Sequence, residues 1–130
     1  MRPDNLANNN YRRQQALSEA RMERSQALID ITEGLLEPWD VILEACQPHG
    51  IAFRKISLHQ LLLARPHAGD PAAKRDLHRL SVLLELQDDS SRTIGWLIDP
   101  RAGQRRLHAW LELHRQRTSP WDGFPLAPGR

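Results

Sequence analysis

Apolar residues recur at helical spacing along most of the chain, and the longest such pattern lies near the N-terminus. Residues 11–36 contain no proline, and their single glycine, Gly34, stands near the end of the segment, where glycine commonly terminates a helix. The segment therefore predicts one long amphipathic helix. The positions that we expect on its apolar side are Ala20, Ala27, Leu28, Ile31 and Leu35.

Residues 57–86 predict two helices joined by a short polar link. Ser57 precedes an apolar run and Gln60 follows it by three residues, as in a capping box that opens a helix. Asp70 and Pro71 form a second start signal, with Asp70 as the N-cap and proline at the first helical position. The apolar stripe that we expect on the second helix is Ala73, Leu77, Leu80 and Leu84.

Shorter patterns fill the rest of the chain. Residues 38–46 predict a short helix, and residues 51–56 alternate weakly, which predicts an extended connector or an irregular helical turn. Residues 93–97 predict one helical turn that holds Trp96 in the core, and the last helix spans about residues 100–117. The expected apolar positions are Trp39, Ile42, Leu43 and Cys46 in the first of these helices and Leu107, Trp110 and Leu111 in the last.

Every strong periodic signal is helical, so the sequence predicts an all-α fold with one long N-terminal helix and about four shorter helices. A single domain spans residues 11–117. Residues 1–10 are polar and are expected to form a disordered N-terminal tail. Residues 118–130 contain three prolines and two glycines, which predicts a C-terminal tail without a helix.

The charge of the chain is unevenly distributed, although its total is small. The formal net charge is +2, which is too small to indicate nucleic acid by itself. Residues 91–130 hold seven arginines and three acids, whereas residues 31–60 hold two cations and four acids. Lys55 and Lys74 are the only lysines. Arginine suits forked contacts with phosphate, but a GC-rich genome produces the same bias.

Signatures of catalysis, metal binding and membrane insertion are absent from the sequence. It has no nucleophile elbow, Walker loop or zinc-binding histidine pair, and its six histidines do not fall in metal-ligand spacing. Cys46 is the only cysteine, which fits a reducing compartment, and its apolar stripe predicts a buried thiol. The longest apolar run is four residues. We therefore expect a non-enzymatic cytoplasmic protein with no cofactor, metal, membrane or small-molecule substrate.

Two groups of polar and cationic residues are candidate anion-binding sites. The first lies around the link and comprises Arg65, His67, Gly69, Lys74 and Arg75. The second lies at the start of the last helix and comprises Arg101, Gln104, Arg105 and Arg106. Cations at a helix start oppose the helix dipole unless an anion binds there, and glycine lets a backbone approach a ligand closely. The alternatives are an ordinary glycine turn for the first group and ion pairs with nearby acids, such as Asp99, for the second.

Taken together, these segments resemble the actinobacterial integration host factor family, small all-α nucleoid proteins that bind DNA through a helix-two-turn-helix motif. The resemblance covers about residues 20–113. It is carried by the segments ARMERSQALIDITEGL, VILEA, RKIS leading into LLL, the turn from Pro66 to Gly69, and QRR before the last leucines. The family has a lysine directly after the glycine of the turn, where this chain has Asp70-Pro71, and an arginine-rich segment where this chain reads TIGWLID. A divergent member, encoded by a phage or another mobile element, fits these departures.

The resemblance implies a nucleoid protein that binds double-stranded DNA mainly through its backbone, with low sequence specificity, alone or in a recombinase complex. The DNA-contacting residues would be the two groups above together with Lys55. A sequence-specific regulator would instead need side chains aimed at base edges, for which Gln104 with Arg105 is the only candidate pair. The alternative is a small regulator that binds a host protein and no DNA. Its marks are the acidic residues 33–44 and the tail residues Trp121 and Phe124, which either fold back on the body or dock onto a partner.

Overall fold

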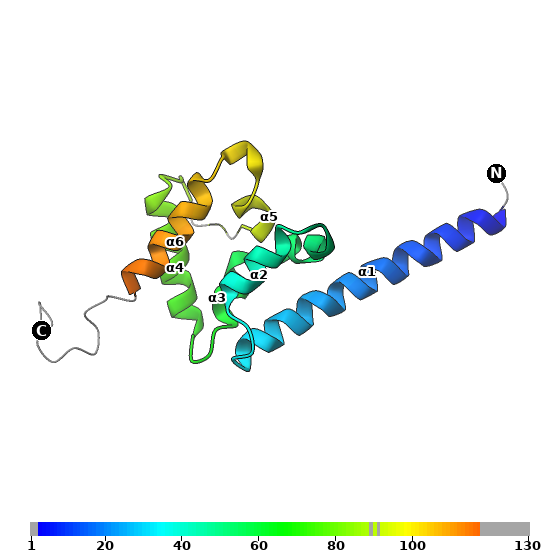
Figure 1. Ribbon diagram of the computed structural model, residues 1–130, viewed down its shortest axis with the longest axis horizontal. Helices are drawn as coiled ribbons and strands as arrows, with labels where there is room; N and C mark the ends of the chain where they lie inside the picture. Colours follow the sequence, from blue (N-terminus) through cyan, green and yellow to red (C-terminus); the bar gives the residue numbers. More distant parts are fainter. Residues whose placement is uncertain (1–2, 89, 91, 118–130) are drawn as a thin grey trace, which may run out of the picture.

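Helices form every regular element of the protein in the part of the chain that the computed structural model describes, residues 3–88, 90 and 92–117 (Figure 1). The only β-type pairing within these residues is an isolated antiparallel bridge between Ser57 and Thr93. The predicted all-α class is therefore confirmed. The elements are α1 (Pro3–Thr32), α2 (Pro38–Ala45), the 3-10 segment η1 (Pro48–Lys55), α3 (Leu58–Leu63), α4 (Asp70–Leu83), α5 (Ile94–Leu97), the 3-10 turn η2 (Pro100–Ala102) and α6 (Arg105–Arg117).

Helix α1 differs from its prediction at both ends. It begins at Pro3, so residues 3–10 are helical where we predicted a disordered tail. Proline fits the first turn of a helix, and no other proline or glycine interrupts the residues that follow. At the other end, Gly34 has a φ of +80° and the Leu35 amide donates to the Asp30 carbonyl at 2.8 Å. This C-cap confirms the role of Gly34 and places Leu35 beyond the helix, exposed instead of on the apolar stripe.

Only the C-terminal end of α1 packs against the other helices. Ala27 and Ile31 are buried, whereas every side chain from residue 7 to residue 23 is exposed except the half-buried Ala20. Figure 1 shows that the N-terminal half of α1, coloured blue, extends away from the cluster of the other helices. We call residues 7–23 the free arm of α1.

The remaining helices bury one core. Segment η1 contacts α1, α2 and α5, while α4 packs between α3 and α6. Trp110 of α6 is almost completely buried, and all four positions predicted for the α4 stripe are buried. Leu111, predicted on the same apolar face as Trp110, is instead 42% exposed.

The buried side of α2 is turned by about one position from the predicted side. Leu43 and Cys46 are exposed, so the prediction of a buried Cys46 thiol is wrong. The reason is the path of η1, which crosses the end of α2 so closely that a Cβ at Gly50 would lie 1.9 Å from the Glu44 carbonyl oxygen. The face of α2 that meets η1 is therefore the buried one. Its buried residues are Val41, Ile42 and Ala45.

The two start signals of the central unit have different outcomes. Ser57 Oγ accepts a hydrogen bond from the Gln60 amide at 3.0 Å, and Gln60 Oε1 accepts one from the Ser57 amide at 3.1 Å, which confirms the capping box. At the start of α4, Gly69 occupies the N-cap and Asp70 is the first helical residue. The N-cap prediction for Asp70 is wrong because its carboxylate binds neighbouring side chains instead of the first amides of α4.

The C-terminal elements are more broken than predicted. Residues 51–56 lie within and just after η1, which matches the irregular helical turn. Residues 94–97 form a single turn capped by Thr93, and Trp96 packs against the core as a half-buried side chain. The predicted last helix is interrupted after η2 by Gly103, with a φ of +64°, before α6 begins. The predicted tail at residues 118–130 lies outside the described residues.

Candidate nucleic-acid interface

The link between α3 and α4 carries the first predicted group, which we call the link cluster. It comprises Arg65, His67, Gly69, Lys74 and Arg75. Arg65 turns into the fold: its Nε donates to the Leu62 carbonyl at 2.8 Å and its Nη2 to Asp76 Oδ2 at 2.8 Å. Only 14% of the Arg65 side chain and 4% of the Asp76 side chain are exposed. Arg65 therefore ties the end of α3 to α4, which corrects its placement on a DNA-contacting surface.

The special backbone conformation of the link lies at His67 and not at Gly69. His67 is exposed and has a φ of +64°, in the left-handed region. Gly69 has a φ of −99°, and a Cβ there would meet only Pro71 Cδ, at 3.6 Å. The conformation of the link therefore does not require glycine at position 69.

The start of α4 already carries a negative charge of its own. The Asp70 carboxylate binds Lys74 Nζ at 3.0 Å and His59 Nε2 at 2.9 Å, and these two contacts, Lys74 first, lower the pKa of Asp70. Pro71 supplies no amide to an incoming ligand. A DNA phosphate at this helix start would meet the Asp70 carboxylate. Within the link cluster, Arg75 is the exposed cation that has no ion pair among the described residues.

The second group, which we call the α6 cluster, comprises Arg101, Gln104, Arg105 and Arg106. Arg101 lies in η2 and forms a forked contact with Asp99, with Nη2 to Oδ2 at 2.8 Å and Nε to Oδ1 at 3.2 Å. Hydrogen bonds from the Arg101 side chain and backbone amide lower the pKa of Asp99 from 3.8 to about 2. The Arg101 charge is therefore balanced locally by the acid that the sequence offered as its alternative partner.

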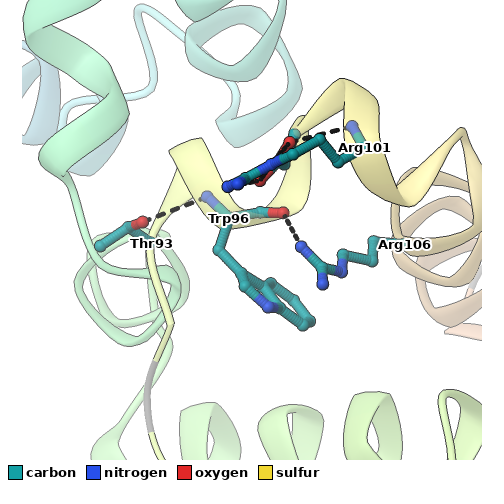
Figure 2. Close-up of polar contacts among 5 residues, drawn as sticks. Thr93, Trp96, Arg101 and Arg106 are labelled. Atoms are coloured by element: carbon teal, nitrogen blue, oxygen red, sulfur yellow. Dashed lines mark hydrogen bonds and ion pairs between the residues drawn. The ribbon is translucent and has the colours of Figure 1, made fainter.

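Arg106 is held by Trp96. Figure 2 shows its guanidinium beside the indole, and Nη1 donates to the Trp96 carbonyl at 2.8 Å. The guanidinium carbon lies 4.3 Å from the ring centroid, and that of Arg92 lies 5.0 Å from it. The sequence assigned Trp96 to the core; it packs against the core as a half-buried side chain, and its ring also orients two arginines.

The start of α6 leaves Gln104 and Arg105 exposed. The Gln104 carbonyl accepts from the His108 amide at 2.9 Å, so Gln104 stands at the N-cap position. Arg105 has no hydrogen-bond or ion-pair partner in the described part of the chain. It borders a cavity of about 260 Å³ that is also lined by Leu84, Leu86, Trp96, Ala102 and Arg106.

The two clusters lie at opposite ends of α4. The link precedes the first residue of this helix, whereas the cavity beside Arg105 includes Leu84 and Leu86, which follow its last residue. Fourteen residues at a rise of 1.5 Å separate the two ends by about 20 Å. The clusters therefore cannot hold one phosphate together, and a duplex would have to run along α4 to touch both.

A third cationic region lies between α1 and α3 and was missed in the sequence. Arg21, Arg24, Ser25 and Gln60 line a cavity of about 240 Å³ together with Leu28 and Ile56. Arg24 is half-buried and donates to the Ala52 carbonyl at 3.4 Å, whereas Arg21 is exposed. The three-residue spacing of these arginines on one side of α1 was the available signal.

The cations that remain available are distributed over the free arm and the body. In the described part of the chain these side chains are exposed and have no hydrogen-bond or ion-pair partner. They are Arg12, Arg13, Arg21, Lys55, Arg75 and Arg105. Trp121 and Phe124, the predicted docking side chains, lie outside the described residues.

Neither a metal-binding cluster nor a membrane-spanning helix is found among the described residues. No group of three or more histidine, cysteine, aspartate or glutamate side chains among them could hold a metal ion. None of their helices combines the length and the apolar character that crossing a bilayer requires. No protein-family model matches the sequence, and comparisons with curated proteins and with solved structures give no match.

Proposed function

We propose that the chain is a non-enzymatic DNA-binding protein that contacts mainly the phosphate backbone with low sequence specificity. The observation that carries this proposal is the free arm of α1, which projects from the body and presents Arg12, Arg13 and Arg21 without acidic partners. Positive side chains that are not neutralised within the fold are the ones that can replace counterions on DNA.

The arrangement favours backbone contact over base reading. Nine residues separate Arg12 from Arg21, which corresponds to about 13 Å along α1, and Lys55, Arg75 and Arg105 lie on the body. Charges spread in this way match a polymer with closely repeated phosphates better than a single small anion. A protein of this kind would act on the bacterial nucleoid.

Fluorescence anisotropy on arbitrary duplex DNA tests the proposal. The slope of log K against log salt should be negative and approach about −5 if all six free cations engage, at about 0.9 per phosphate. Replacing Arg12, Arg13 and Arg21 together with glutamine should reduce the slope by about 2–3 and weaken all sequences equally.

The matched control replaces Gln14, Gln15 and Ser18 of the same arm with alanine, which keeps the helix and its charge. This control should bind as the unmodified chain does. A flat salt slope for the unmodified protein, or equal losses in the two triple variants, would refute the proposal.

A further inference from the structure

An apolar groove lies between the start of α2 and the last turns of α6. Its cavity measures about 340 Å³ and is lined by Pro38, Trp39, Trp110, Leu111 and His114, with Glu37 at its edge. Trp110 forms its buried floor, while Trp39 is half-buried and Leu111 is 42% exposed. The groove therefore exposes aromatic and aliphatic surface directly above the core.

The groove lies close to the point where the described part of the chain ends. Leu111 and His114 are three residues apart on one face of α6 and stand six and three residues before Arg117, its last residue. Six residues of helix between Leu111 and Arg117 cover about 9 Å. Four residues of extended chain beyond Arg117 span up to about 14 Å. Residue 121 can therefore turn back and reach Leu111.

Position 121 is a tryptophan. It is the first large apolar side chain after α6, and the segment 118–130 that carries it lies outside the described residues. An indole buries about 150–250 Å² and packs well against other aromatic rings in offset or edge-to-face contact. Trp39 and His114 offer such rings. Trp121 closes a shorter loop than Phe124, so its return to the groove costs less chain entropy.

We propose that Trp121 of the same chain binds in the groove formed by Pro38, Trp39, Leu111 and His114. A tether of four residues beyond α6 gives the indole a high effective concentration at the groove, which a separate partner would have to exceed. This proposal does not depend on DNA binding.

Fluorine NMR of the full chain with 5-fluorotryptophan tests the proposal, with the four resonances assigned by single replacements of tryptophan with phenylalanine. The Trp121 resonance should be shielded from a soluble gadolinium chelate. Replacing Leu111 with glutamate should abolish this shielding because it places a carboxylate in the groove. The matched control is Val82→Glu, at a 63% exposed position on α4, which should leave the shielding unchanged.

A second variant keeps the test valid if Leu111→Glu perturbs folding. Trp121→Ser alters no described residue, and it should shift the Trp39 resonance while that of Trp96, which lies beside the start of α6, stays in place. Full broadening of the Trp121 resonance by the gadolinium chelate in the unmodified chain would overturn the proposal. So would shielding that depends on protein concentration, which would indicate a second copy as occupant, or a Trp39 shift caused by Phe124→Ala and not by Trp121→Ser.

Discussion

Replacing Arg65 with alanine should destabilise the fold strongly, whereas replacing Lys74 should not, although both cations pair with an aspartate of α4. The two ion pairs have similar lengths, 2.8 Å for Arg65 with Asp76 and 3.0 Å for Lys74 with Asp70. Their burial differs: 14% and 4% of the side chains are exposed in the first pair and 71% and 48% in the second. Truncation of Arg65 removes the guanidinium from a buried carboxylate, which costs up to about 3–5 kcal/mol.

Thermal and urea unfolding followed by circular dichroism measure this difference. For a chain of this length, about 3 kcal/mol corresponds to a fall in the melting temperature of roughly 10 °C. Lys74→Ala should leave the midpoint almost unchanged, because exposed pairs contribute little. Replacing Arg65 with methionine and Asp76 with leucine together should recover much of the loss. Equal effects of Arg65→Ala and Lys74→Ala would refute the assignment of Arg65 to the interior. So would a double variant (Arg65→Met with Asp76→Leu) whose loss equals the sum of the losses of its two single replacements.

Three further predictions concern backbone approach, capping and titration. Gly50→Ala should destabilise by about 3 kcal/mol or more in urea unfolding, because its Cβ would overlap the carbonyl of Glu44, 1.9 Å away; tolerance of alanine there would contradict the close approach of η1 to α2. Ser57→Ala should cost about 1 kcal/mol in the same assay through loss of the α3 cap, and no change would show that the cap is not formed. Because folding lowers the pKa of Asp99 from 3.8 to about 2 through Arg101, Asp99 stabilises the protein at neutral pH and loses this effect as the pH falls through that interval. The difference in unfolding midpoint between the unmodified chain and Asp99→Asn should therefore shrink over that interval, and a difference that grows there would contradict the assignment.

Features that depend on a few neighbouring residues could be predicted from the sequence. The capping box of Ser57 and Gln60 uses two residues three apart, and the helix end at Gly34 uses one glycine, so each is local chemistry. The α4 stripe is equally local, because helical periodicity alone brings its members to one side. Pairing between elements is not local. The buried side of α2 is set by η1, and periodicity could not show that Cys46 would be exposed.

The same limit explains the outcome for the candidate site. A sequence shows which residues carry charge, but it does not show which charged side chains are already held by other groups of the fold. Arg65, Arg101 and Arg106 were grouped with Arg75 and Arg105 because all are cations near a helix start. In three dimensions the first three are engaged by Asp76, Asp99 and Trp96. The free arm of α1 was overlooked for the converse reason, since an exposed mixed face has the same pattern whether it lies on the body or projects from it.

The start of α4 is a potential phosphate-binding helix start that already carries its own acid. In the integration host factor family that the sequence was predicted to resemble, a lysine directly follows the link glycine, at a helix start where a phosphate can bind. Here Asp70 supplies the negative charge that the helix dipole favours, and it also draws Lys74 to itself. A phosphate at this position would have to displace that carboxylate and manage without the amide that Pro71 lacks. If the chain binds DNA as proposed, its contacts must therefore shift from the link to cations that no acid neutralises, and the largest group of these lies on the free arm of α1.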